Sequence, residues 1–100
     1  MYINNKALGM GHSPLIIAEM SGNHNQSLDK ALEIVEAAAN AGAHALKLQT
    51  YHPDTITMDM STPEFMIAGG LWDGQSLYEL YKGAFMPWEW HKPLFDYAKK

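Results

Sequence analysis

Residues 15–50 follow a strand–helix–strand pattern, and this order limits the folds open to the chain. The first segment, Leu15 to Met20, is an apolar run of strand length with a single acid, Glu19, near its end. Its residues are apolar on both sides, which is typical of a buried parallel strand covered on both faces. A strand, a helix and a second strand joined by short links predict one βαβ unit with parallel strands.

The helix of this unit has the clearest periodicity in the chain. Apolar residues recur at spacings of three and four from Leu28 to Ala39, and acidic residues occupy the opposite face. Ser27 suits the N-cap position. Gly42 suits the left-handed residue that ends many helices. We therefore expect a helix that begins after Ser27 and ends before Gly42.

The second strand, ALKLQT, alternates between apolar and polar side chains. Leu46 and Leu48 share one side, and Lys47 and Gln49 share the other. If the leucines pack against the preceding helix, the polar pair must face the opposite side of the sheet, which in a barrel is the lumen. Glu19 is free to take that same side. The pattern thus predicts that Glu19 and Lys47 lie together.

The flanking segments are less regular. At the N-terminus, YINNKAL predicts a small hairpin, because Asn4 and Asn5 tolerate the left-handed backbone of a tight turn. We divide the chain into a hairpin and lead-in over residues 1–13 and a domain over residues 14–100. In the long stretch after Thr50 we expect a single short helical turn, after Thr62 and Pro63. A loop of that length in a compact domain is weakly indicative of a lid or a binding loop.

Two further helices are expected in the C-terminal half. SLYELYKGA has amphipathic spacing, and a final helix should begin near Pro87. Pro93 is awkward inside that final helix, so it either kinks the helix or marks a later start.

Composition excludes several classes of protein. With 47% apolar and 18% charged residues, the chain is typical of a globular protein rather than a disordered one. It has no cysteine, which excludes disulfide scaffolds and thiolate metal sites. A net charge of -4 without a basic cluster weighs against a nucleic-acid partner. No apolar run reaches membrane-spanning length, so we expect a soluble, cytoplasmic protein.

Three residues are candidates for chemistry. Glu19 ends an apolar strand and precedes a polar loop, although a surface acid at a strand end is the alternative. For Lys47, burial within an apolar strand would require an anionic partner, and the alternative is a lysine that reaches solvent from an edge strand. His24 is equally compatible with a substrate contact and with a loop histidine that bonds the backbone. A lysine and a carboxylate at adjacent strand ends suit an anionic substrate whose reaction moves protons.

The other histidines and the aromatic residues are more simply structural. His52 and Asp54 lack the spacing and the third ligand of a metal site, and a turn at His52-Pro53-Asp54 is favoured. We interpret His12, His44 and His91 as surface residues. The aromatic residues of the second half are expected in the core or at a subunit interface, namely Trp72, Trp88, Trp90, Tyr78, Tyr81 and Tyr97.

The run IIAEMSGNHNQSLDKALEIVEAAANAGAHALKLQTY resembles the N-terminal part of the sialic acid synthase family. Members of that family carry an acid in the first strand, an NH loop, an AGA helix end and a K-x-Q second strand. The later run LWDGQSLYELYKGAFMPWEWHKPLF resembles the pseudaminic acid synthase branch. The similarity extends over nearly all of the chain from Pro14 onward.

This resemblance implies a TIM-barrel enzyme that condenses phosphoenolpyruvate with an amino sugar to give a nonulosonic acid and phosphate. Glu19 matches the family's active-site glutamate, and Lys47 matches the lysine that binds phosphoenolpyruvate. Asn23, His24 and Gln49 match motif positions that line the site. A divalent metal, Mn²⁺ or Mg²⁺, and a homodimer of the full-length enzyme are implied in the same way.

The chain departs from the family in length. A (β/α)₈ barrel needs about 250 residues, so one hundred residues supply an α/β fold with only the first two βα units and the hairpin. The family's metal ligands lie further along, so we expect no metal ligand here and no activity from this chain alone. Two alternatives stay open, an N-acetylneuraminate synthase that uses N-acetylmannosamine and a non-catalytic βαβ binding or structural module.

Overall fold

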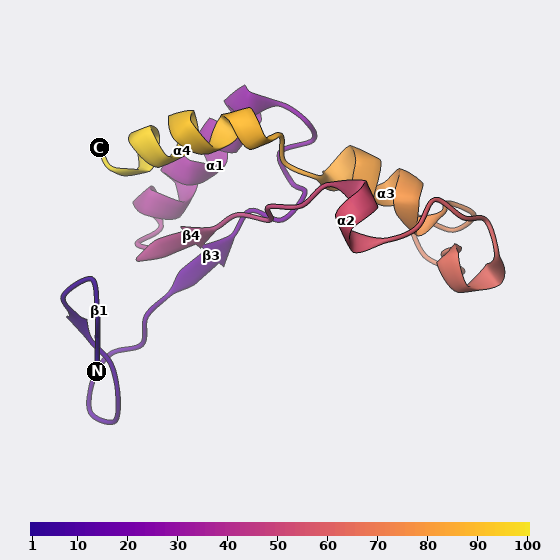
Figure 1. The fold of residues 1–100 in the computed structure, drawn as a ribbon. Coiled ribbons are helices and arrows are strands. Elements are labelled where there is room, and N and C mark those ends of the chain that lie inside the picture. The colour runs from indigo at the N-terminus through magenta and orange to yellow at the C-terminus, as the bar shows by residue number, and fades with distance from the viewer.

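The computed structural model describes residues Met1–Lys100 and has a mixed α/β fold with two small sheets. In Figure 1 a parallel strand pair lies in the middle, with two helices along one side of it. The N-terminal hairpin lies beyond one end of this pair, and the remaining helices lie beyond the other. None of the helices has the length and the apolar character that crossing a membrane requires.

The N-terminal hairpin is confirmed. Strand β1 (Tyr2–Ile3) pairs antiparallel with β2 (Lys6–Ala7). The turn between them places Asn4 at φ 45° and Asn5 at φ 65°. Both central residues of a type I′ turn have positive φ, and asparagine adopts that backbone more readily than most residues. The two asparagines therefore determine the turn.

The strand–helix–strand unit is present with the expected parallel pairing. Strand β3 (Ile17–Glu19) pairs with β4 (Ala45–Lys47), and helix α1 (Leu28–Asn40) connects them. Ser27 caps α1, since its hydroxyl oxygen accepts a hydrogen bond from the backbone N–H of Lys30. Gly42 follows the helix end at φ +85°. Both predicted ends of the helix are thus confirmed.

The expectation of a strand buried on both faces is wrong for β3. The regular part is three residues long, and Ile17 keeps 52% of its surface exposed. The predicted second strand, residues 45–50, is likewise reduced to Ala45–Lys47. With only two strands in the sheet, each strand has one unpaired edge and one face that no other element covers.

The second half has one α-helix more than predicted. A single-turn helix, α2 (Pro53–Ile56), stands where the sequence predicted a plain turn. It forms because Pro53 sits in the first turn, where the missing N–H is not needed. The expected turn after Thr62 is the 3₁₀ helix η1 (Pro63–Phe65). Helix α3 (Leu77–Ala84) follows as predicted.

The final helix begins later than Pro87. A 3₁₀ turn, η2 (Trp88–Trp90), leads into α4 (His91–Ala98). Pro93 therefore lies in the first turn of α4, where its ring removes no helical hydrogen bond. Of the two options for Pro93, the later start is confirmed.

The core lies where α1, α4 and one face of β4 meet (Figure 1). Leu46 and Leu48 pack against it, as their shared side predicted, and the polar side of β4 faces away. The core is small, with five buried apolar side chains: Met20, Ala31, Val35, Met86 and Leu94. Tyr97 of α4 packs against this core, and its hydroxyl group donates a hydrogen bond to the Glu36 carboxylate of α1 at 3.2 Å.

Candidate active site

Glu19 and Lys47 lie together at the ends of the two parallel strands. They are register partners, and Lys47 Nζ lies 3.1 Å from Glu19 Oε1. The predicted juxtaposition is therefore confirmed. The expected burial of Lys47 is wrong, because 56% of its side chain is exposed on the uncovered face of the sheet.

An ion pair with this exposure contributes little to folding. Pairs of this kind stabilise proteins by about 0–1 kcal/mol. Its chemistry is more informative. A lysine ammonium has three N–H donors, and Glu19 occupies one of them. Lys47 thus keeps donors for a phosphate or carboxylate, while Glu19 offers an acceptor within reach of the same ligand.

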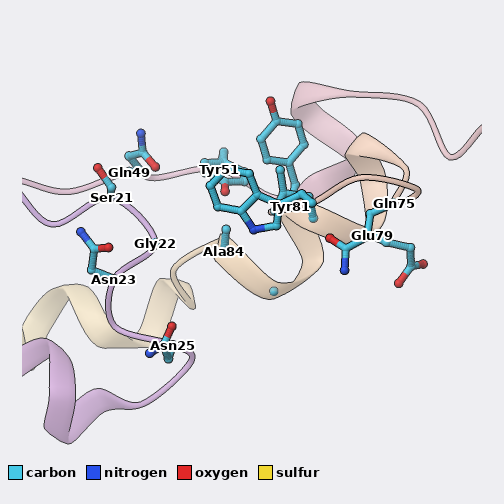
Figure 2. A pocket seen from close by; sticks show the side chains of 13 residues that line it. Ser21, Gly22, Asn23, Asn25, Gln49, Tyr51, Gln75, Glu79, Tyr81 and Ala84 are labelled. Atoms are coloured by element: carbon cyan, nitrogen blue, oxygen red, sulfur yellow. The ribbon is translucent and has the colours of Figure 1, made fainter. Parts of the chain in front are cut away.

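A pocket of about 550 Å³ lies beyond this pair, between the loop after β3, the segment after β4 and helix α3. Figure 2 shows Asn23, Ser21 and Gln49 at one end of the pocket, with Gln75 and Glu79 at the other. Its wall is formed by thirteen residues, namely Ser21, Gly22, Asn23, Asn25, Gln49, Tyr51, Trp72, Gln75, Glu79, Leu80, Tyr81, Gly83 and Ala84.

The wall of the pocket is aromatic and polar but nearly uncharged. Tyr51 and Tyr81 meet edge to face with ring centroids 5.6 Å apart. Burial, and then the neighbouring Tyr81, raise the pKa of Tyr51, so its hydroxyl group stays neutral. Glu79 is the one carboxylate, and Lys82 neutralises it at 3.2 Å. Amides and aromatic faces without net charge suit a neutral, hydroxyl-rich or amide-bearing ligand.

The predicted site residues therefore divide into two groups. Asn23 and Gln49 line the pocket, whereas Glu19 and Lys47 lie outside its wall. Gln49 connects the two groups, because it lines the pocket and follows Lys47 by only two residues in the chain. The geometry provides a cationic end and a neutral end that one composite ligand, or two ligands side by side, could occupy.

The fifth predicted residue, His24, does not line the pocket. Its side chain is completely buried. Its Nδ1 accepts a hydrogen bond from the backbone N–H of Gln26 at 3.0 Å, and its ring meets that of Trp90 edge to face. Burial lowers the pKa of His24, so its ring is neutral at pH 7. Of the two options for His24, the structure contains the backbone hydrogen bond.

Several wall residues were missed from the sequence. Ser21 and Asn25 belong to the same polar loop as Asn23, so their place in the pocket wall could have been predicted from that loop. Trp72 and Tyr81, which we assigned to the core or an interface, contribute to the pocket wall instead. No local pattern distinguishes these roles, because their neighbours come from segments far away in the sequence.

His91 is also more than a surface residue. Its side chain is half-buried, and its Nε2 lies 2.7 Å from the hydroxyl oxygen of Thr50. His44 is exposed, as expected, but its Nδ1 accepts a hydrogen bond from the backbone N–H of Ile16. His52 and Asp54 form a pair at 3.1 Å.

The chain contains no group of three histidine, aspartate or glutamate side chains that could hold a metal ion. The pair of His52 and Asp54 lacks a third ligand, and Glu19 is already paired with Lys47. The residues present therefore do not fit the divalent metal implied by the resemblance.

Comparison with known proteins finds relatives over most of the chain. Residues 34–100 match the family model described as the NeuB family. The chain is 51% identical over 84 residues to a pseudaminic acid synthase of Campylobacter jejuni, a match that covers 84% of this chain and 24% of that protein. It is 48% identical over 87 residues to a pseudaminic acid synthase of Helicobacter pylori, covering 87% of this chain and 26% of that protein.

The fold is also similar to that of a solved structure. The structure superimposes on the crystal structure of the spore coat polysaccharide biosynthesis protein SpsE from Bacillus subtilis with a TM-score of 0.65 and 34% identity. That match covers 99% of this chain and 24% of the SpsE chain. The chain thus spans about a quarter of the length of the curated relatives. Since the family model matches more than half of the sequence, the chain belongs to the NeuB family.

Proposed function

We propose that the chain is the N-terminal part of a pseudaminic acid synthase. Such an enzyme condenses phosphoenolpyruvate with a 2,4-diacetamido-2,4,6-trideoxy sugar to give pseudaminic acid and phosphate. The observation that carries the proposal is the Glu19–Lys47 pair at the strand ends, adjacent to a neutral pocket. Relatives at 51% and 48% identity that are named pseudaminic acid synthase support this choice of sugar.

Each end of the site suits one of the two substrates. Phosphoenolpyruvate is a compact anion, and the free donors of Lys47 can bind its phosphate or its carboxylate. The sugar is neutral and carries amides and hydroxyl groups, so it suits the end lined by Asn23, Gln49 and the aromatic residues. The phosphoenolpyruvate then lies beside the sugar, as a bond between them requires.

The bond changes of this reaction are as follows. C3 of phosphoenolpyruvate forms a bond to the aldehyde carbon of the sugar, and the aldehyde oxygen takes up a proton to become a hydroxyl group. Water adds at C2 and supplies the equivalent of that proton. The C2–O bond to phosphate then breaks, the second proton of water leaves with the phosphate, and a ketone remains at C2. Glu19 is placed to accept a proton near Lys47, and Lys47 stabilises the negative charge of the bound anion. A divalent metal and a homodimer remain part of the proposal through the family resemblance, with ligands outside these 100 residues.

We further propose that the barrel is incomplete in this chain. The radius of gyration is 16.8 Å, whereas a compact domain of this length has about 13 Å. Only seven of 100 residues are buried, and large apolar side chains such as Ile16, Ile17 and Leu71 are exposed. In a (β/α)₈ barrel, further strands would pair with the free edges of β3 and β4, and the remaining units would cover exposed apolar side chains of this kind. On this proposal the 100-residue chain is inactive alone.

Phosphate release tests the function. The complete gene product should release phosphate from phosphoenolpyruvate with the 2,4-diacetamido-2,4,6-trideoxy sugar. Release with N-acetylmannosamine in its place would favour an N-acetylneuraminate synthase. Absence of release with every sugar would contradict a synthase of this type.

Thermal unfolding of the isolated chain tests the incomplete barrel. A broad, non-cooperative melt or aggregation is expected, because two strands bury too little apolar surface for an independent fold. A sharp cooperative transition at low protein concentration would contradict the proposal and favour a self-contained βαβ module.

A further inference from the structure

His24 differs from every other polar residue near the pocket. Its side chain is completely buried, while Asn23 and Asn25 on either side are exposed and line the pocket. We infer that His24 is a positioning residue that holds these two asparagines in place without touching a ligand itself. The kinetic part of this inference rests on the proposed function.

The hydrogen bond to His24 determines its tautomer. Its Nδ1 accepts from the backbone N–H of Gln26 at 3.0 Å, so Nδ1 carries no proton. The proton of the neutral ring is then on Nε2. Nε2 is buried and has no oxygen or nitrogen partner. The ring of Trp90 lies edge to face with the imidazole at a centroid distance of 5.2 Å, so an aromatic contact holds the buried ring.

The loop that carries His24 needs such an anchor. Ser21, Asn25 and Gln26 have φ values of 52°, 49° and 59°, in the left-handed region that L-residues avoid. A backbone of this kind persists only where the surroundings hold it. The Gln26 side chain donates to the carbonyl oxygen of Phe85, and Gly22 packs closely against Ala84.

The same distant segment, Ala84 to His91, also holds the second loop of the site. Thr50, which follows Gln49, contacts His91 Nε2 at 2.7 Å. The rings of Phe85 and His52 meet edge to face, with their centroids 5.4 Å apart. Both site loops are therefore fixed to one segment. The contact between His24 and Trp90 is the buried part of this attachment.

A spectrum of the complete protein tests the tautomer directly. With ¹⁵N-labelled histidine, the long-range ¹H–¹⁵N correlations at pH 7 should show His24 with Nε2 protonated and Nδ1 unprotonated. Assignment uses His24→Asn, which removes that signal. A proton on Nδ1, or a cationic ring at pH 7, would overturn the inference.

Two variants separate the two contacts of the ring. His24→Phe keeps an aromatic ring against Trp90 but removes the acceptor for the Gln26 N–H. His24→Asn keeps an acceptor at the same position in the loop, as in an Asx turn, but loses the ring. The exposed His12 provides the matched control, His12→Phe.

The expected kinetic effect is confined to the pocket. His24→Phe should raise KM for the sugar about tenfold and leave KM for phosphoenolpyruvate within about twofold, because Lys47 does not lie on this loop. His24→Asn should recover part of the loss, and His12→Phe should have no effect. An equal rise in both KM values, or no rise in either, would overturn the positioning role.

The tautomer distinguishes failure of this inference from failure of the proposed function. If the wild-type protein releases no phosphate, the proposed function is contradicted. The spectrum still tests the tautomer of His24, because it does not depend on activity. In that case hydrogen exchange of the Gln26 amide replaces the kinetics. Exchange at least tenfold faster in His24→Phe than in wild type would support the inference, and an unchanged rate would overturn it.

Discussion

Lys47 and Glu19 face each other across two parallel strands in register, with Nζ 3.1 Å from Oε1 and both side chains about half exposed. Because water reaches both side chains, neither charge depends on the other for its solvation. Removal of either one should therefore change ligand binding far more than stability, and this difference separates a site from a structural ion pair.

On the proposed function, Lys47→Ala should weaken binding of phosphoenolpyruvate to the complete gene product by about ten- to a hundredfold. A hydrogen bond to a charged group contributes about 1.5–3 kcal/mol, and each 1.4 kcal/mol corresponds to about tenfold in affinity. The free energy of unfolding should change by no more than about 1 kcal/mol. Calorimetric titration and urea denaturation measure the two quantities. Lys30→Ala, which breaks a similarly exposed pair with Glu33 away from the pocket, is the control and should leave affinity unchanged.

Gly22→Ala should destabilise the protein by about 1–3 kcal/mol, as overpacking does. A Cβ atom at Gly22 would lie 3.0 Å from Ala84 Cβ and 3.3 Å from its Cα. The backbone of Ala84 is held within α3 and cannot move aside easily. Gly83→Ala is the matched control, since a Cβ atom there meets nothing within 4 Å. It should stabilise α3 by about 0.5–1 kcal/mol. Equal effects of the two substitutions on urea denaturation would contradict the close approach.

Stability should decrease as the pH falls below about 6.5, the ordinary pKa of histidine. Burial lowers the pKa of His24 in the folded state. Between the lowered value and 6.5 the unfolded chain binds more protons than the folded chain, so acid favours unfolding. Well above pH 6.5 the ring is neutral in both the folded and the unfolded state, so His24 no longer changes the free energy of unfolding with pH. Urea denaturation between pH 5 and 8 measures it. His24→Asn should remove the slope, and His12→Asn should retain it.

Ser27→Ala should cost about 1 kcal/mol of stability, with a range of about 0.5–2 kcal/mol. The hydroxyl oxygen of Ser27 accepts the otherwise unpaired N–H of Lys30 at the start of α1. Ser76→Ala at α3 removes the equivalent bond to Glu79 and should have a similar effect. Ser61 is exposed and caps no helix, so Ser61→Ala should lie within about 0.5 kcal/mol of wild type. A Ser27→Ala variant as stable as Ser61→Ala would show that the cap is not significant.

Features that depend on a few neighbouring residues were predictable. Asn4 and Asn5 determine the hairpin turn, and Ser27 and Gly42 determine the ends of α1. The alternation in ALKLQT placed Lys47 on the side of Glu19. These rules act within one turn or one strand pair, so the local sequence contains the information.

Features that depend on distant segments were not predictable. The burial of His24 depends on Trp90, sixty-six residues away, and the pocket wall depends on how Tyr51 meets Tyr81. The exposure of Lys47 depends on how many strands the sheet contains. The sequence by itself therefore determined the elements, their ends and the Glu19–Lys47 pair, because short-range propensity and strand parity specify them. Only the tertiary structure decided which side chains are buried and which line the pocket, because burial depends on segments brought together from both halves of the chain.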